Sequence, residues 1–467
     1  MTEKYTEEDL VEKLLSQCST ISDSAMVRAW ANSKSNISER IKTNLTLMGG
    51  DEKTTFEIIS RVFSKYIVFA NPYKEKGQEL CDFIAILNDK VFLFSDKGGE
   101  AFDKVSLADE KIIEKKWKNK CSAIKRSNEQ LFEAKEWIEK NIKKDRLKIY
   151  NDNLCENPVE FTFKGKPDFF LITTLNGFSD LAKEKYLNNG SLPINMKNIQ
   201  SNKKILSIPL KKEDLGSKNF VHIFDIEGLR NACEWCNTPV DFMNYLKFRI
   251  KFLKEVSKNI DEIKQENNIV YFYIYKDLIK KDAPLEKVEE VLRLNLLKNN
   301  NFIKSLLKID GFGHYLIRKD KSVLFDNIIS HLFHTGSNGE ENNYENEINY
   351  RNKIYDVLFL NRKDRVMISE CITALEENAK NKTTYKILKF RNIYVQVIAL
   401  KMNEDEDIDI FLKRRSDYIK KESDKFLRQG IMKKGKIQKA FFIVIDHPKN
   451  HIRLHAEYMS VKDKSWN

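Results

Sequence analysis

The sequence predicts a mixed α/β fold, in which a central sheet is flanked by helices. Two apolar runs, Leu80–Leu87 and Val91–Ser95, have the length and composition of buried strands, and the tight turn "NDK" joins them. Between Lys111 and Lys140 apolar residues recur at helical spacing, which predicts one long amphipathic helix. The next run, "DFFLITT" (Asp168–Thr174), is again typical of a strand. Elements in this order predict a compact α/β unit.

Two further elements are expected before these strands. Thr54 and Glu57 have the spacing of a capping box, so a helix is predicted to begin near Thr54. The run Ile67–Ala70 predicts the first strand. We therefore expect residues 51–175 to form one domain in the order helix, three strands, helix and strand, with short N-terminal helices in residues 1–50.

The remaining chain is expected to have three parts. Residues 176–333 contain the strand-like runs "KILSIPL" and "NFVHIFDIEGL" and a strong helix that starts near Pro239, and they are predicted to be mostly helical beyond it. Residues 334–349 are polar, acidic and rich in Gly and Asn, which predicts a linker or loop. Residues 350–467 predict a second α/β domain, with strands at "KIYDVLFLN", "RVMISECITAL", "IYVQVIALK" and "KAFFIVID" and a basic helix.

Composition narrows the class of protein. The chain of 467 residues is 41% hydrophobic, which is enough for well-formed cores. It has no apolar run near the ~20 residues of a membrane helix and no signal-peptide pattern, so we expect a cytoplasmic protein without a membrane partner. Its seven cysteines are scattered, which is typical of reduced thiols. Cys233 and Cys236 form a lone CxxC pair, and because a structural zinc site needs about four donors, packed core thiols are favoured.

The net charge of +12 is concentrated in two stretches. Lys111–Lys148 has 13 Lys and Arg against 6 Asp and Glu, and Phe411–Lys439 has 11 against 3. Basic stretches of this kind favour a polyanionic partner, most often nucleic acid. The alternative is a lysine-rich protein whose helices carry solvated charges.

Charged residues interrupt the two buried runs, although an unpaired buried charge is costly. Asp82 lies within the first run and Asp96–Lys97 ends the second. With Gly77 and Glu79, these residues follow the pattern G-x-E-x-x-D, apolar strand, acid–Lys, and residues 50–175 thereby resemble the PD-(D/E)xK nuclease superfamily. The resemblance implies a restriction-endonuclease-like fold and hydrolysis of phosphodiester bonds in nucleic acid, DNA more than RNA. It also implies a role in restriction or anti-phage defence.

The resemblance also assigns roles to individual residues. It makes Asp82, Asp96 and Glu79 ligands of Mg²⁺ or Mn²⁺, Lys97 the catalytic lysine and Glu57 a helix-borne acid beside the metal. Such a site suits the reaction because carboxylates hold hard divalent cations, which polarise the phosphoryl group and acidify a bound water. A nearby lysine can orient or help to deprotonate that water and offset developing charge.

Further residues are predicted to contact the nucleic acid or the site. Gln130 stands where related nucleases place a helix glutamine near the active site, and an ordinary exposed glutamine is the alternative. The basic residues expected to bind the phosphate backbone are Lys125, Arg126, Lys413, Arg414 and Arg415.

One position departs from the family pattern. The acid is expected two residues before the lysine, because residues i and i+2 of a strand face the same way, but Ser95 occupies that position and the acid is Asp96. A β-bulge could turn Asp96 toward Lys97. Otherwise the alternatives are an inactive nuclease-like protein that binds nucleic acid, or a scaffold subunit with a protein partner or a second copy of the chain. In these alternatives Asp82 and Lys97 form a structural ion pair and Glu57 is only a helix cap.

The C-terminal domain has a similar arrangement of acids. Asp356 lies within one strand-like run and Glu370 ends the next, at the spacing of Asp82 and Asp96, but Ile372 stands where the lysine would be. This region is therefore either a degenerate nuclease-like copy or an unrelated α/β domain.

Overall fold

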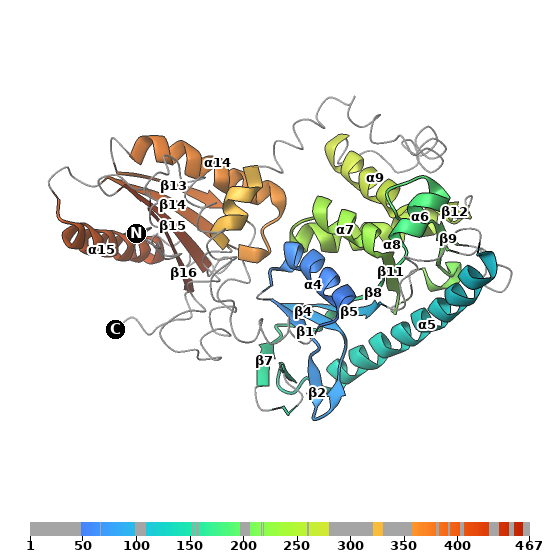
Figure 1. Cartoon of the computed structure of the whole chain (residues 1–467). Coiled ribbons are helices and arrows are strands. Elements are labelled where there is room, and N and C mark those ends of the chain that lie inside the picture. Colours follow the sequence, from blue (N-terminus) through green and yellow to red (C-terminus); the bar gives the residue numbers. More distant parts are fainter. Residues whose placement is uncertain are drawn as a thin grey trace, which may run out of the picture. The chain divides into compact units, whose positions relative to one another are not determined.

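The computed structural model has a mixed α/β fold, as predicted, and its described residues form two compact units, one within 48–279 and the other within 321–460 (Figure 1). The predicted helices before residue 48 and the predicted linker at 334–349 lie outside the described part of the chain. The structure describes residues 48–65, 67–98, 109–151, 154–155, 158–196, 206–215, 217, 219–258, 261–279, 321–329, 357–379, 383–390, 393–401, 406–428, 439–447 and 453–460.

A five-stranded mixed sheet forms the core of the N-terminal unit. Its strands, in spatial order, are β1 (Val68–Ala70), β4 (Phe83–Leu87), β5 (Lys90–Lys97), β8 (Asp168–Leu175) and β11 (Val221–Asp225). Strand β4 runs antiparallel to both of its neighbours, β1 and β5, whereas β5, β8 and β11 are parallel to one another. All three central strands were predicted, although β4 starts three residues later than expected.

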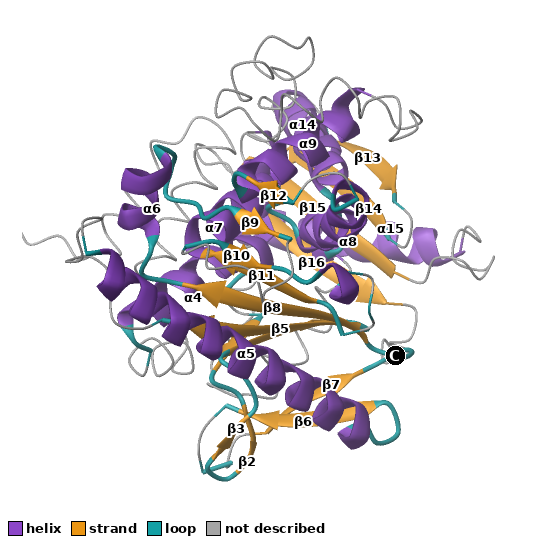
Figure 2. Ribbon diagram, turned by 90° about the vertical axis from the view of Figure 1, so that its right-hand side faces the viewer, coloured by secondary structure: helices purple, strands orange, loops and turns teal. Residues whose placement is uncertain are grey.

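Two helices cover opposite faces of this sheet. Helix α4 (Gly50–Phe63) lies on one face, where Phe63 packs against Phe92 and Phe94 of β5. Helix α5 (Glu110–Asn141) lies across β5 and β8 on the other face (Figure 2). Side chains alternate along a strand, so even-numbered residues of β5 face α4 and odd-numbered residues face α5.

The start of α4 corrects one prediction. The helix begins at Gly50, four residues before the predicted start at Thr54, and its capping interaction is the bond from the Gly49 N–H to Glu52 Oε2 at 3.0 Å. Thr54 instead donates its hydroxyl to the Gly50 carbonyl. The capping-box interpretation of Glu57 is therefore wrong, because Glu57 lies in the second turn of the helix and not in its first.

Smaller elements complete the N-terminal unit. A second sheet has the order β3-β2-β6-β7, a third has the order β10-β9-β12, and helices follow β8 and β11. Their bounds are β2 (Tyr73–Glu75), β3 (Gln78–Glu79), β6 (Arg146–Tyr150), β7 (Pro158–Thr162), α6 (Ser179–Tyr186), β9 (Ile194–Asn195), β10 (Ile208–Pro209), a 3₁₀ turn (Lys212–Asp214), α7 (Ile226–Trp235), α8 (Pro239–Val256), β12 (Glu262–Ile263) and α9 (Glu266–Ile279). The predicted start of α8 is confirmed, since Thr238 caps it and Pro239 occupies its first turn.

A buried ion pair joins α8 to α9 and to the sheet. Arg249 and Glu266 are both fully buried, and the guanidinium donates Nε to Glu266 Oε1 at 2.7 Å and Nη2 to Oε2 at 2.9 Å. Nη2 also donates to the Ile223 carbonyl of β11, and the Tyr245 hydroxyl donates to Glu266. Losing one partner would leave the other charge buried and unpaired, which is far more costly than losing a surface pair.

The C-terminal unit has a four-stranded sheet in the order β13-β14-β15-β16. Its two antiparallel strands β13 and β14 are followed by helix α15 and by β15, which is parallel to β14. This connectivity matches that of β4, β5, α5 and β8. The bounds are α14 (Arg362–Ala379), β13 (Thr384–Lys389), β14 (Tyr394–Lys401), α15 (Ile408–Arg428), β15 (Lys439–His447) and β16 (Arg453–Ser460).

Helix α14 overturns one part of the prediction for this unit. The run "RVMISECITAL" was predicted as a strand but is helical, and its buried residues Ile368, Cys371, Ile372 and Leu375 have helical spacing. Residues 357–361 of "KIYDVLFLN" also contain no strand, and Asp356 lies outside the described residues. Glu370 thus lies on an exposed helix surface, 2.8 Å from Lys321, and the comparison with Asp96 is wrong.

The described residues also bear on the expectations for the CxxC cysteines and for membrane-spanning helices. Cys233 and Cys236 are both buried in the core, as the packed-thiol prediction requires. No helix in the described part of the chain combines the length and the apolar character needed to cross a membrane.

The buried ion pair gives a stability prediction. Glu266→Gln should lower the free energy of unfolding by about 3–5 kcal/mol, because it leaves the buried Arg249 charge uncompensated. Glu255→Gln, which removes the exposed partner of Lys258, should cost less than about 1 kcal/mol. Urea denaturation of both variants measures the difference, and equal costs would show that the buried pair is not important for stability.

Candidate functional site

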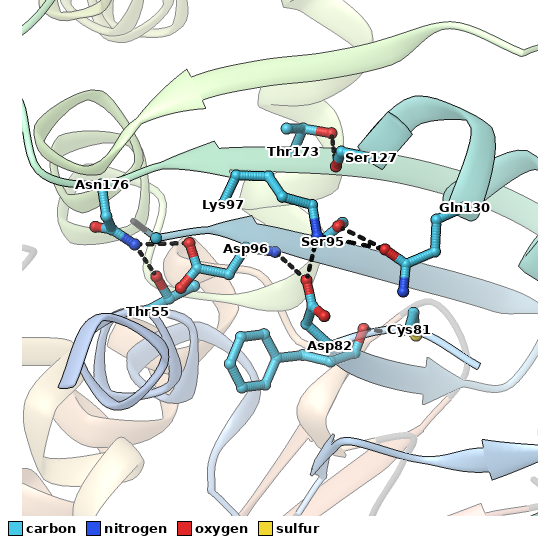
Figure 3. Close-up of polar contacts among 12 residues, drawn as sticks. Thr55, Cys81, Asp82, Ser95, Asp96, Lys97, Ser127, Gln130, Thr173 and Asn176 are labelled. Atoms are coloured by element: carbon cyan, nitrogen blue, oxygen red, sulfur yellow. Dashed lines mark hydrogen bonds and ion pairs between the residues drawn. The ribbon is translucent and has the colours of Figure 1, made fainter. Parts of the chain in front are cut away.

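Asp82 directly precedes the first residue of β4, and its carboxylate lies beside the part of β5 that continues past the β4–β5 ladder. The antiparallel ladder between these strands ends at the pair Phe83–Phe94. Two residues further along β5, Asp82 Oδ2 accepts the backbone N–H of Asp96 (Figure 3). A carboxylate therefore replaces a strand carbonyl as the acceptor, which explains why an acid is tolerated beside a buried strand: Asp82 is 9% exposed.

Lys97 extends over the same carboxylate and toward α5. Its Nζ lies 3.5 Å from Asp82 Oδ2 and donates to Gln130 Oε1 at 3.4 Å. Ser95 Oγ donates to the same amide oxygen at 3.1 Å. We call Asp82, Ser95, Lys97 and Gln130 the rim cluster (Figure 3). The structure thus brings together three predicted site residues, Asp82, Lys97 and Gln130, from β5 and two neighbouring segments.

Asp96 faces the other side of the sheet. The pairing of β5 with β8 is continuous through Asp96 and Lys97, so the strand has no bulge that could turn Asp96 toward Lys97. Its Oδ1 accepts the Asn176 amide at 2.6 Å, and the same amide donates to Thr55 Oγ1 on α4 at 3.2 Å. The β-bulge considered from the sequence is therefore absent.

The second oxygen of Asp96 is poorly satisfied. Asp96 is 6% exposed, and its Oδ2 has no partner in hydrogen-bonding geometry among the described residues. Burial raises the pKa of Asp96 to about 7, and the carboxylates of Asp82 and Asp51 raise it further, whereas the Thr55 hydroxyl and the Asn176 amide lower it. At neutral pH Asp96 is therefore close to its own midpoint of ionisation.

The Glu79 carboxyl also has a raised pKa. It lies on the exposed strand β3, but partial burial of its carboxyl raises its pKa to about 7. Asp82 and Glu52 add to this rise, and Lys97 opposes it. The predicted ligands Asp82, Asp96 and Glu79 thus interact electrostatically, although Asp96 approaches from a different face of the sheet.

Two acids of α4, Asp51 and Glu52, were not predicted. They occupy the first turn of α4, and a Cβ added to Gly98 would lie 2.7 Å from Asp51 Oδ2. The predicted helix acid, Glu57, is instead exposed. Glu57 comes five positions after Glu52, which places the two side chains about 140° apart around the helix. The structure therefore does not bring Glu57, which the resemblance made a helix-borne acid beside the metal, to the same side of α4 as Glu52.

Other polar residues near the site carry weak or no sequence signals. Asn176 directly follows β8, and this position could have indicated a residue at the sheet edge. Lys120 of α5 is buried at the end of β5 but is one of many lysines in that helix. Ser127 and Thr173 share a buried hydrogen bond of 2.9 Å between α5 and β8.

The predicted phosphate-binding residues have different environments. Lys125 and Arg126 are exposed on α5, and Lys125 lies 3.9 Å from Glu129. In the C-terminal unit Lys413 is exposed and Arg415 is half-buried. Arg414 is held by Glu406, with Nε at 2.7 Å from Oε1, so its charge is already compensated.

The donor chemistry at the site fits a hard divalent cation. Asp96 Oδ2 is buried without a partner in hydrogen-bonding geometry among the described residues, and burial raises the pKa values of Asp96 and Glu79, so a bound divalent cation would stabilise both carboxylates. Within the described residues, however, no three Asp, Glu, His or Cys side chains are grouped so that they could hold a metal ion. Mg²⁺ commonly binds through only one or two carboxylates and keeps several waters, so a smaller protein ligand set is sufficient.

Comparison with protein-family models, with curated proteins and with solved structures gives no match to this chain. The function must therefore be inferred from the geometry and charge of the site itself.

The raised pKa of Asp96 gives a pH-dependent prediction. Because the folded pKa of about 7 exceeds the usual value of 3.8, ionisation of Asp96 makes folding less favourable as pH rises from about 4 to 7. Asp96→Asn, which mimics the protonated acid, should stabilise the protein by roughly 2–4 kcal/mol at pH 8 and by little at pH 4. Urea denaturation at both pH values measures this.

The control for that experiment is Asp180→Asn, at an exposed carboxylate of α6. It should change stability little at either pH. If Asp96→Asn and the control behave alike at pH 8, the Asp96 carboxylate is not under electrostatic strain.

Proposed function

We propose that the N-terminal unit is a metal-dependent nuclease of the PD-(D/E)xK type, which hydrolyses phosphodiester bonds of nucleic acid, DNA in preference to RNA. The observation that carries this proposal is the rim cluster. It places the Lys97 amine between the Asp82 carboxylate and the Gln130 amide, with further carboxylates around them.

The connectivity of the unit supports the same proposal. Around the main sheet the chain order is α4, β1, β4, β5, α5 and β8, interrupted by the strands β2, β3, β6 and β7 of the second sheet, and α5 lies on the connection between the parallel strands β5 and β8. This is the order that the resemblance implies for a restriction-endonuclease-like core. The acidic residues gather where β5 and β8 end, and ligands of open parallel sheets commonly bind at such strand ends.

The side chains of this cluster have the properties that the reaction needs. Asp82 and Glu79, with Asp96, would hold Mg²⁺ or Mn²⁺, which when bound polarises the phosphoryl group and acidifies a water. The Lys97 ammonium would orient that water and stabilise negative charge that develops on the phosphate oxygens. Gln130 and Ser95 fix the direction of the lysine, since Gln130 Oε1 accepts hydrogen bonds from both the Lys97 ammonium and the Ser95 hydroxyl.

Exposed basic residues on α5 support nucleic acid as the substrate. Lys125 and Arg126 lie on the same helix as Gln130, within two turns of it, and both are exposed. Phosphate contacts of this kind give affinity but no sequence specificity. A role in restriction or anti-phage defence, in a cytoplasmic protein, is an association with nucleases of this type and does not follow from the site.

The second candidate function is a nuclease-like module that binds nucleic acid without cutting it, alone or as a subunit of a larger assembly. The position of Asp96 favours it, because this acid faces α4 and not the Lys97 side of the sheet. In that case the Asp82–Lys97 pair is purely structural. The two functions differ in whether Lys97 is needed for cleavage.

A cleavage assay tests the proposal. Purified protein with Mg²⁺ or Mn²⁺ should cut plasmid or linear DNA, and Lys97→Ala should lower the rate by about 10²–10⁴-fold because it removes a group that acts in proton transfer. Lys166→Ala, at an exposed lysine outside the cluster, should cut at the wild-type rate. DNA, RNA and a metal-free reaction are run in parallel. Absence of cutting under every condition would leave the binding module as the better proposal.

Binding to DNA is predicted separately. The double variant Lys125→Ala, Arg126→Ala should weaken binding and should lower the slope of log K against log salt by up to about 2, since each lost phosphate contact contributes about 0.9. Fluorescence anisotropy across a salt series measures both effects. An unchanged slope would show that this part of α5 does not contact the phosphate backbone.

A further inference from the structure

Lys120 of α5 reaches the same end of β5 as the rim cluster, but from a different direction. Its Nζ donates to the carbonyl oxygen of Lys97 at 2.5 Å and to that of Gly98 at 2.8 Å. The residue is 9% exposed. A buried ammonium is unfavourable unless its hydrogen bonds and charge are satisfied, so two carbonyl contacts by one buried lysine indicate a specific structural task.

The surroundings of Lys120 hold its side chain in place. The Phe178 ring lies under the ammonium, 5.2 Å from Nζ, and Trp117 packs edge-on against that ring. Burial lowers the pKa of Lys120, and Lys97 lowers it further, whereas Asp96 and Asp51 favour the charged form.

The end of β5 needs this support because its ladder is incomplete. On the β4 side the ladder has already ended at Phe94, and only the Asp82 carboxylate continues it. On the other side, Lys97 pairs with β8, and its carbonyl also accepts the Asn176 N–H at a long 3.4 Å. The two bonds from Lys120 are thus the shortest polar contacts that the structure gives the carbonyls of Lys97 and Gly98.

We propose that Lys120 is a positioning residue, which fixes the main chain of Lys97 and Gly98 so that the Lys97 amine stays between Asp82 and Gln130. The inference rests on the proposed nuclease function for its catalytic consequence, but its structural part can be tested independently. Lys120 does not contact the reacting groups in this arrangement, because its ammonium points at main-chain carbonyls.

The C-terminal unit contains a comparable contact. There Arg414 of α15 donates Nη2 to the carbonyl of Lys401 at 2.8 Å, and Lys401 ends β14, the strand that corresponds to β5 in connectivity. A guanidinium on the crossover helix can therefore hold a strand end in the same way. This predicts that arginine can replace Lys120, whereas an apolar side chain of similar length cannot.

The first readout is amide hydrogen exchange, which requires no catalytic activity. Lys120→Met should speed exchange of the Asn176 and Asp96 amides, whose acceptors are Lys97 O and Asp82 Oδ2, and should leave the Ile223 amide of β11 unchanged. Lys120→Arg should behave like the wild type. Unchanged exchange at Asn176 and Asp96 in Lys120→Met would overturn the proposal.

The second readout is steady-state cleavage of DNA. Lys120→Met should lower kcat by about 10²-fold, because small misplacements of a catalytic group have effects of this size, with KM within about twofold of the wild type. Lys120→Arg should restore most of kcat, and the exposed control Lys118→Met should have no effect. A rise in KM alone, or failure of arginine to restore kcat, would contradict a positioning role.

The two readouts separate the two proposals. If the wild type does not cut nucleic acid, the nuclease proposal fails, and hydrogen exchange alone decides whether Lys120 positions the strand end. If Lys120→Met does not fold, Lys120→Gln, whose amide has two N–H donors on a shorter and uncharged side chain, takes its place, with intermediate exchange expected. Exchange equal to that of the wild type in Lys120→Gln would then overturn the proposal.

Discussion

The Asp82 carboxylate connects the parts of this site. One of its oxygens accepts the N–H of Asp96 where the β4–β5 ladder has ended, and the Lys97 ammonium lies 3.5 Å from that oxygen. A neutral hydroxyl could continue the ladder, as Thr383 does for the Lys401 N–H in the C-terminal unit, but it could not attract a lysine. The acid at this position therefore determines both the end of β5 and the direction of Lys97.

The balance of charge around Asp82 supports the proposed chemical role over a purely structural one. A structural ion pair needs one acid and one base, but among the described residues five acids interact near the end of β5, against the two bases Lys97 and Lys120. The acids that interact there are Asp51, Glu52, Glu79, Asp82 and Asp96. Burial, and then the neighbouring carboxylates, raise the pKa values of Glu79 and Asp96, and a bound divalent cation would favour the ionised forms of both. Sites with strained electrostatics of this kind are typical of function.

The sequence predicted the elements with strong local patterns. Helix α5, strands β5, β8 and β14 and the start of α8 near Pro239 were found because buried runs, helical spacing and an N-terminal proline are local signals. The resemblance to the nuclease motif, and not these patterns, singled out Asp82, Lys97 and Gln130, which lie together in the structure. Helix α14 was missed because β-branched residues suggested a strand, whereas the helical spacing of its buried residues decides the structure.

Other features depend on tertiary contacts and carry no local signal. The side of the sheet that Asp96 faces depends on whether β5 has a bulge, and it has none. The start of α4 was predicted four residues too late, because the residue before the helix is Gly49, whose N–H Glu52 accepts but which has no side chain to mark it as a helix cap. Lys120 could not be singled out among the lysines of α5, since its burial follows from the packing of Trp117 and Phe178.

The most direct test of a cation site at this end of the sheet is the titration of the Asp96 and Glu79 carboxyl groups by ¹³C NMR, with and without Mg²⁺. Asp96→Asn and Glu79→Gln assign the two signals. Without metal both groups should titrate near pH 7, and Mg²⁺ should move both midpoints well below that value, since a bound cation favours the ionised form. If both groups titrate near pH 4 without metal, or if Mg²⁺ leaves midpoints near 7 unchanged, this end of the sheet is not a cation site.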